Sequence, residues 1–204
     1  FADGDEIISI AETDEGTITI ETKTGRSHSP ARESILQDGC LECRYPVPEE
    51  CDLLVDAPAK DPGDGGYSRV AGFENLDRGE RWNYFMQEIS KCIRCNACRQ
   101  ACPTCYCKEC FAEQTDLNWI SPGSDISDAM IFHLVRIFHQ AGRCVECDAC
   151  YRACPMGVDL RMFTRKIVKD VEDLFEYLPD FNLENTPPIS TFLEEDKQEF
   201  ITEP

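Results

Sequence analysis

Two groups of four cysteines are the most informative residues of this 204-residue chain. The first motif contains Cys92, Cys95, Cys98 and Cys102, and the second motif contains Cys144, Cys147, Cys150 and Cys154. In each motif the cysteines are spaced by three, three and four residues, and a proline follows the last one. The second motif begins 52 residues after the first. The pattern is therefore an internal repeat.

The spacing of each motif suits the ligation of a 4Fe-4S cluster. Three cysteines at three-residue intervals wrap a loop around such a cluster, and neighbouring backbone N–H groups face its sulfurs. In two-cluster ferredoxins with this C-x2-C-x2-C-x3-C-P run, the fourth cysteine ligates the other cluster. We therefore predict two 4Fe-4S clusters with crossed ligation. One would be held by Cys92, Cys95, Cys98 and Cys154, and the other by Cys144, Cys147, Cys150 and Cys102.

Zinc, disulfides and haem explain the repeat less well. Zinc sites usually take two separated C-x2-C pairs, which leaves the third and fourth cysteines of each motif without a role. Disulfides require neither the proline nor the repeat, and the cysteines are bunched along the chain instead of spread. No C-x-x-C is followed by histidine, so attachment of a c-type haem is excluded.

Six further cysteines occur in two regions of the sequence. Cys40 and Cys43 form one C-x-x-C pair, Cys107 and Cys110 form another, and Cys51 and Cys105 lie near one pair or the other. Two such pairs provide four thiolates, which suit a third iron-sulfur cluster or a structural zinc ion. Free thiols in a reducing cytosol are the remaining interpretation. We expect a third metal site formed by Cys40, Cys43, Cys107 and Cys110.

The elements that must position these cysteines are predicted to be helices. Apolar residues recur at helical spacing over residues 80–89, 124–142 and 159–174. The first of these helices leads into Cys92, and the second leads into Cys144. The sequence thus predicts a mainly α domain over residues 80–178.

The segments on either side have different patterns. Residues 1–79 begin with alternating apolar residues from Ile8 to Ile20, which predict a small β-hairpin, and continue through loop-rich sequence. Residues 170–204 hold eleven acidic residues and one basic residue, and we predict an extended acidic tail over 179–204. Apolar side chains within this tail leave two interpretations open, a solubilising end and an arm that docks on a partner.

The charge and hydropathy of the chain exclude several classes of partner. With 39 acidic and 20 basic residues the formal net charge is −19, which argues against nucleic acid and anionic membranes as main partners. Every apolar stretch is shorter than the ~20 residues that a transmembrane helix requires. The chain begins at Phe1 without the basic start and apolar run of a secretory signal. We expect a soluble, cytoplasmic protein.

Residues for acid–base or nucleotide chemistry are not evident. His133 and His139 are six residues apart, which places them on different faces of a helix, and we interpret them as surface or packed side chains. The glycines between residues 63 and 66 match neither a dinucleotide fingerprint nor a P-loop. The two predicted clusters are fully ligated by protein, and outer-sphere electron transfer needs no open metal position. We therefore predict a non-catalytic electron-transfer subunit, with a metal-stabilised structural scaffold as the alternative.

Two stretches, from Cys92 to Pro103 and from Cys144 to Asp159, resemble the α-helical ferredoxin domain. This domain occurs in the iron-sulfur subunits of heterodisulfide reductases (their C type) and of succinate dehydrogenases, and the resemblance covers about residues 80–178. The continuation from Cys102 to Cys107 is similar to sulfhydrogenase β subunits, to the A-type subunits of anaerobic sulfite reductases and to electron-transfer subunits of formate dehydrogenases. The resemblance implies a place in an anaerobic multi-subunit redox complex, relaying electrons between a flavin or ferredoxin site and a catalytic subunit.

Overall fold

A computed structural model describes most of the chain. The described residues are 5–13, 17–44, 51–53, 66–116, 119–121, 123–180, 182, 184–192 and 194. The chain divides into two compact units, residues 1–66 and residues 67–204. The glycines between residues 63 and 65 and the tail after residue 194 lie outside the described residues.

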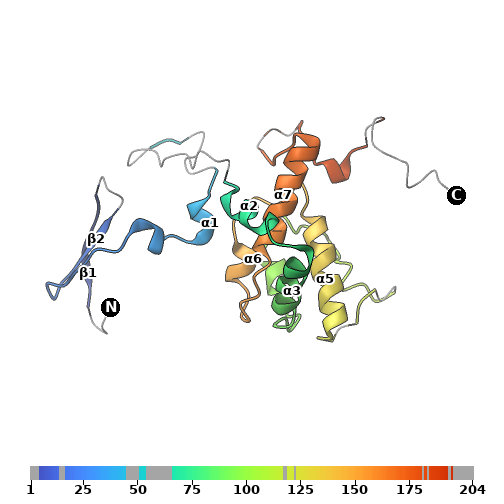
Figure 1. Ribbon diagram of the computed structural model, residues 1–204, viewed down its shortest axis with the longest axis horizontal. Coiled ribbons are helices and arrows are strands. Elements are labelled where there is room, and N and C mark those ends of the chain that lie inside the picture. Colours follow the sequence, from blue (N-terminus) through green and yellow to red (C-terminus); the bar gives the residue numbers. More distant parts are fainter. Residues whose placement is uncertain are drawn as a thin grey trace. The chain divides into compact units, whose positions relative to one another are not determined.

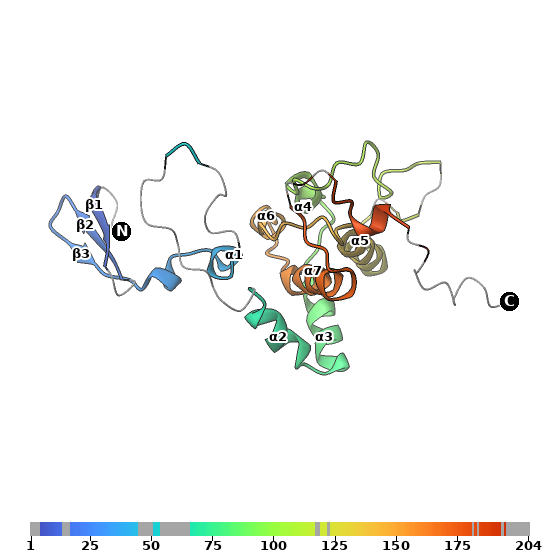
Figure 2. The same ribbon diagram turned by 90° about the horizontal axis from the view of Figure 1, so that it is seen from above.

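The first unit contains a three-stranded antiparallel sheet. Strand β1 (Ile7–Glu12) pairs with β2 (Ile18–Thr22) (Figure 1). Strand β2 pairs in turn with β3 (Ser27–His28) (Figure 2). A 3-10 turn, η1 (Arg32–Ser34), and a short helix, α1 (Asp38–Leu41), follow the sheet. Every residue of β1 is exposed, and no apolar side chain among the described residues of this unit is buried.

The second unit is helical. Its elements are α2 (Ser68–Glu74), α3 (Arg78–Ile89), α4 (Ala97–Gln100), α5 (Ile126–His139), α6 (Ala149–Arg152), α7 (Arg161–Phe175) and the 3-10 turn η2 (Pro188–Ser190). Helix α5 packs against both α3 and α7, and α7 also packs against α2 (Figure 1). The two short helices that follow the cysteine loops, α4 and α6, pack against each other (Figure 2). The two motifs are thereby brought together.

The ends of the long helices follow from local sequence. Asp77 and Glu80 form a capping box at the start of α3, in which each side chain accepts a hydrogen bond of 2.8 Å from the backbone N–H of the other. Asp125 caps α5 by accepting a hydrogen bond from the Ser127 N–H. After α5 the chain turns at Gly142, whose φ of 66° is in the left-handed region that glycine tolerates.

The region around α2 differs from the loop expected there. Val70 is fully buried, and the α2 residue Glu74 binds Lys169 of α7 at 2.8 Å. Tyr67, just before α2, donates a hydrogen bond of 2.5 Å to Glu172 of α7. Residues 67–79 therefore belong to the helical unit, although its seven-residue helix is too short to give a clear periodic signal.

The hydrophobic core of the second unit lies directly beneath the cysteine motifs. Its buried members are Phe85, Ile89, Ala129, Ile137, Val158 and Leu160. Phe163 packs its ring edge-on against Phe85, with a centroid distance of 5.4 Å. Cys92 and Cys154 also pack against this core. One set of contacts thus supports a cysteine from each motif.

Helix α3 also holds the segment that follows the second motif. A carboxylate oxygen of Glu88 accepts a hydrogen bond of 2.7 Å from the Asp159 N–H. The Tyr84 hydroxyl donates a hydrogen bond of 2.9 Å to the Asp159 carbonyl, and burial, followed by the nearby Asp159 and Glu88 carboxylates, raises the pKa of Tyr84 to about 12. These bonds join two segments about 70 residues apart in sequence and fix the approach to Cys154.

The start of the acidic tail contacts the helical unit. Gly142 is so close to the tail that an added Cβ would lie 3.1 Å from Cδ of Pro188 and 3.5 Å from Cβ of Pro187. Tyr177 lies at the same place, with its ring 3.5 Å from that position. This part of the tail therefore packs against the turn that leads into the second motif.

Candidate metal centres

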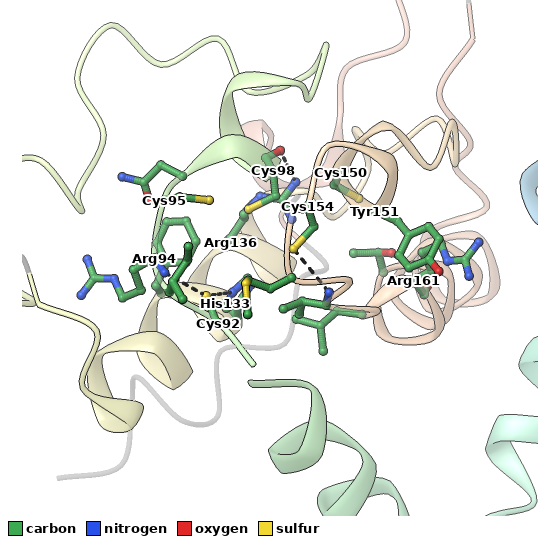
Figure 3. A pocket seen from close by; sticks show the side chains of 17 residues that line it. Cys92, Arg94, Cys95, Cys98, His133, Arg136, Cys150, Tyr151, Cys154 and Arg161 are labelled. Atoms are coloured by element: carbon green, nitrogen blue, oxygen red, sulfur yellow. Dashed lines mark hydrogen bonds between the residues drawn. The ribbon is translucent and has the colours of Figure 1, made fainter. Parts of the chain in front are cut away.

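Two cavities of the second unit collect the cysteines of the repeat. The first cavity is bordered by Cys92, Cys95, Cys98, Cys154 and Cys150, and Figure 3 shows the side chains that line it. The second cavity is bordered by Cys102, Cys144, Cys147 and Cys150. Each cavity therefore has three cysteines of one motif and the last cysteine of the other, and Cys150 borders both.

The two cysteine loops share an unusual backbone conformation. Arg94 and Asn96 of the first motif have φ values of 53° and 60°, and Glu146 and Asp148 of the second have 54° and 57°. These residues occupy equivalent positions of the 52-residue repeat. Left-handed conformations cost most non-glycine residues, such as Arg94 and Glu146, roughly 1–2 kcal/mol, and Asn and Asp tolerate them better. A turn of this kind that occurs twice indicates a shared local requirement.

These turns direct backbone N–H groups towards cysteine sulfurs. The Arg94 N–H donates to Cys92 Sγ at 3.3 Å, and the Glu146 N–H donates to Cys144 Sγ at 3.4 Å. The Val158 N–H donates to Cys154 Sγ at 3.3 Å. Such bonds stabilise negative charge on thiolates and on the sulfurs of a cluster.

His133 is a site residue that the sequence analysis did not identify. Its ring is buried, and Nε2 lies 3.2 Å from Cys92 Sγ (Figure 3). Burial, followed by the charges of Arg136 and Arg94, lowers the pKa of His133 to about 4, so the ring is neutral at pH 7. Its position four residues from both Ala129 and Ile137, on the buried face of α5, is the signal that could have found it.

Arg136 is a second such residue, and it borders both cavities. The guanidinium is buried, donates a hydrogen bond of 3.1 Å to the Cys98 carbonyl and also bonds the Cys150 side chain. Burial alone would lower the pKa of Arg136, but the sulfurs of Cys98 and Cys150 keep it above the usual value. A permanent positive charge therefore stands between the two groups of cysteines.

Ion pairs with two arginines of α7 hold the second cysteine loop. Arg161 of α7 binds Asp148 at 3.1 Å and Asp159 at 2.7 Å, and its guanidinium lies 4.0 Å from the centre of the Tyr151 ring. Arg165, also from α7, lies 3.7 Å from Glu146. Helix α7 therefore holds the second cysteine loop by binding Glu146 and Asp148, the two left-handed residues of that loop.

The cysteines around the two cavities suit an iron-sulfur cluster better than a single metal ion. Burial raises the pKa of Cys98 to about 11 and that of Cys144 to about 12, so a metal would displace protons as it binds. Among the described residues, no three His, Cys or acidic side chains converge as ligands of one metal ion would. In a 4Fe-4S cluster the four cysteines bind separate irons. The four or more cysteines that border each cavity and the N–H donors to sulfur fit a group of this type.

The cysteines of the expected third site are divided between the units. Cys40, within α1, and Cys43 belong to the first unit, whereas Cys107 and Cys110 belong to the second. Cys110 is buried and Cys107 is exposed. A joint site of these four residues stays a prediction. Of the two additional cysteines, Cys51 is exposed and Cys105 is partly buried, and burial raises the pKa of Cys105.

Within the described part of the chain, no helix is both long and apolar enough to cross a membrane.

Comparison with known proteins gives two informative relatives. No family model matches the chain. It is 29% identical over 110 residues to the F420-dependent formate dehydrogenase subunit beta of Methanocaldococcus jannaschii, covering 54% of this chain and 27% of the relative. It is 33% identical over 155 residues to the F420-dependent formate dehydrogenase 1 subunit beta of Methanococcus maripaludis, covering 75% of this chain and 38% of the relative. The matched region spans less than half of either relative, so the similarity is to a part of the beta subunits of two formate dehydrogenases.

Proposed function

We propose that this chain is an iron-sulfur electron-transfer subunit of a multi-subunit redox complex. The observation that carries the proposal is the pair of cavities, each bordered by three cysteines of one motif and the last cysteine of the other. The crossed arrangement follows the ligand pattern of two-cluster ferredoxins with the same cysteine spacing. Arg136 and Cys150 border both cavities, and this supports clusters in neighbouring positions.

The proposed ligands leave no position open for a substrate. The first cluster would be held by Cys92, Cys95, Cys98 and Cys154, and the second by Cys102, Cys144, Cys147 and Cys150. When bound, such clusters supply one-electron redox chemistry. The residues of the chain hold the sulfurs and donate hydrogen bonds to them. Electron relay therefore fits this site better than catalysis.

The relatives narrow the type of complex. Both are named as beta subunits of F420-dependent formate dehydrogenases, and we therefore favour a formate dehydrogenase over the hydrogenase, heterodisulfide reductase and sulfite reductase types. In such a complex the chain relays electrons between a flavin or ferredoxin site and the subunit that oxidises formate. Its partners are these subunits, and the complex works in the cytoplasm.

Anaerobic purification of the full chain with its bound metal tests the core of the proposal. Two 4Fe-4S clusters predict about 8 irons and 8 sulfides per chain, a broad absorption near ~400 nm and EPR signals after reduction. A third cluster would raise the iron content to about 12, and a structural zinc would add one zinc ion. A colourless, zinc-only protein without reducible centres would instead support the structural scaffold.

Affinity purification of the tagged chain from its native host tests the partners. We expect a formate-oxidising subunit to co-purify in a stable ratio. The matched control is the double variant Cys95→Ser and Cys147→Ser, which removes one ligand from each proposed cluster. If the wild-type chain carries both clusters but purifies without another redox subunit, the assignment to a complex is wrong while the cluster assignment stands.

A further inference from the structure

The two cysteine loops have the same backbone but opposite charges. Arg94 and Glu146 are equivalent in the repeat, have φ values of 53° and 54°, and donate their N–H groups to the sulfurs of Cys92 and Cys144. One position therefore carries a positive side chain at the first cavity and a negative one at the second. The next left-handed position changes in the same direction, from neutral Asn96 to acidic Asp148.

The walls of the two cavities continue this difference. Among the described residues, the first cavity is bordered by three arginines and no acidic residue. These arginines are Arg94, Arg136 and Arg161. The charged side chains that border the second are Arg136, Arg165, Glu146 and Asp148. The surroundings of the first cavity are consequently the more positive.

The partners of these charges do not remove the difference. Arg94 donates a hydrogen bond of 2.6 Å to the Ser121 carbonyl, and its nearest acid, Asp128, is 4.0 Å away and outside the cavity wall. Asp159, the other partner of Arg161, is also outside that wall. At the second cavity Glu146 and Asp148 are themselves part of the wall, where Arg165 lies 3.7 Å from Glu146 and Arg161 binds Asp148 at 3.1 Å. Charges act most strongly at short range and away from solvent.

Hydrogen bonds to sulfur occur at both cavities, since at the second the Thr104 hydroxyl lies 3.3 Å from Cys102 Sγ and Arg136 bonds the Cys150 side chain. The two cavities differ in the donors at their equivalent first cysteines. Cys92 is approached by the Arg94 N–H at 3.3 Å and by Nε2 of His133 at 3.2 Å. A metal-bound thiolate has no proton to donate, so Nε2 must carry the proton and donate it to the sulfur. For Cys144, the equivalent cysteine, the corresponding donor is the Glu146 N–H at 3.4 Å. Both N–H···S bonds and nearby positive charge stabilise the reduced form of an iron-sulfur cluster.

We propose that the chain sets its two clusters at unequal potentials through the opposite charges of Arg94 and Glu146, with the first cavity as the favoured place for an added electron. The inference rests on the two-cluster function proposed above. When one electron passes between the clusters, the second is oxidised and the first is reduced by that same electron. Electrons that enter at the second cavity therefore collect at the first. Arg94, Glu146 and His133 are tuning residues in this arrangement.

The test is a redox titration of the full, cluster-loaded chain, followed by EPR. Signals are assigned with Cys95→Ser and Cys147→Ser, since each of these cysteines borders one cavity. In the wild-type chain we expect an added electron to occupy the first cavity at least about tenfold more often than the second. For a one-electron couple this ratio equals a separation of about 59 mV.

Two matched variants measure the contribution of the charges. Arg94→Gln should lower the midpoint potential at the first cavity, and Glu146→Gln should raise it at the second, so each narrows the separation. Arg94→Lys keeps the charge and should largely retain the wild-type values. His133→Gln, which weakens the bond to Cys92, should lower the first potential and leave the second unchanged.

The outcomes separate this inference from the function on which it rests. A chain without clusters would contradict the proposed function. A chain with two clusters whose second cavity is reduced first, or whose separation is the same in Arg94→Gln and Glu146→Gln as in the wild type, would overturn the inference alone. If Arg94→Gln does not retain its clusters, Glu146→Gln and Arg94→Lys still decide the result, because they preserve the first cavity or its charge.

Discussion

The two compact units of this chain differ in how their elements are supported. In the second unit α3, α5 and α7 enclose a core in which Phe85 is only 2% exposed. In the first unit the described part of the sheet has no comparable core, and Ile10 of β1 is 65% exposed although it pairs directly with Ile20. Hydrogen-bonded strands are thus present in one unit without the buried apolar surface that stabilises the other.

The difference between the units indicates that a buried apolar core is what holds the repeat cysteines in position. Burial of apolar surface contributes about 25 cal/mol per Å², and the second unit applies it directly beneath Cys92 and Cys154. A small unit with little buried surface needs another source of stability, such as a metal or a partner. A metal bound by Cys40 and Cys43, as the sequence predicts, would give the first unit one such source.

Removal of a crossed ligand should have the largest effect on the second unit. We expect Cys102→Ser to abolish or strongly perturb the cluster at the second cavity and to affect the first much less, because Cys102 borders the second cavity. Iron analysis and EPR of the reduced variant measure this, with a loss of up to about 4 irons per chain. Cys105→Ser is the neighbouring control. Loss confined to the first cluster would refute the crossed assignment.

Truncation of a core side chain should have the next largest effect. Phe85→Ala should destabilise the second unit by about 3–5 kcal/mol, since it leaves a cavity under the cysteine motifs. Anaerobic denaturant unfolding of the cluster-loaded chain measures this free energy, and loss of absorption near ~400 nm gives a second readout. A change below about 1 kcal/mol would mean that the clusters, and not the core, hold the helices together.

A third metal site would give the first unit a source of stability of its own, in place of the hydrophobic core that the second unit has. If the site exists, Cys43→Ser should remove one zinc or about 4 irons per chain and leave the two repeat clusters in place. Cys51→Ser serves as the matched control, because Cys51 is an exposed cysteine of the same unit. Unchanged metal content together with rapid alkylation of Cys40 and Cys43 would eliminate this site.

The smallest effect is expected on the exposed face of the sheet. Ile10→Thr should change the free energy of unfolding by no more than about 0.5 kcal/mol, because the side chain is already mostly in solvent and threonine retains the β-branched shape. The same denaturation experiment measures it. A loss above about 1.5 kcal/mol would show that Ile10 is covered in solution, which would remove the contrast between the units.

The sequence was most informative where chemistry and local periodicity coincide. The ligation of clusters by the repeat cysteines stays a prediction. The three expected helices correspond to α3, α5 and α7, and three cysteines of each motif border one cavity. These features depend on residues within a few turns of each other. The two-residue strand β3 and the seven-residue helix α2 are too short for a periodic pattern, and α2 depends on contacts with α7.

The tuning residues could not be predicted for a different reason. Arg136 is a charged residue in the middle of α5, which on its own indicates a solvent-exposed position. It is buried because sulfurs from both motifs surround it, and these come together only when the two halves of the repeat pack. The role of His133 likewise depends on its contact with Cys92, a residue 41 positions earlier in the sequence. Such roles arise from tertiary contacts.

The left-handed residues of the two loops have a consequence for how this protein can change during evolution. The N–H groups that bind Cys92 and Cys144 belong to the backbone, whereas the charges at Arg94 and Glu146 belong to side chains on the same residues. A single substitution can therefore reverse the local charge while the ligand geometry persists. Point mutation alone can therefore make the charge of one loop differ from that of the other. At these two positions the backbone geometry and the side-chain charge can therefore change independently of each other.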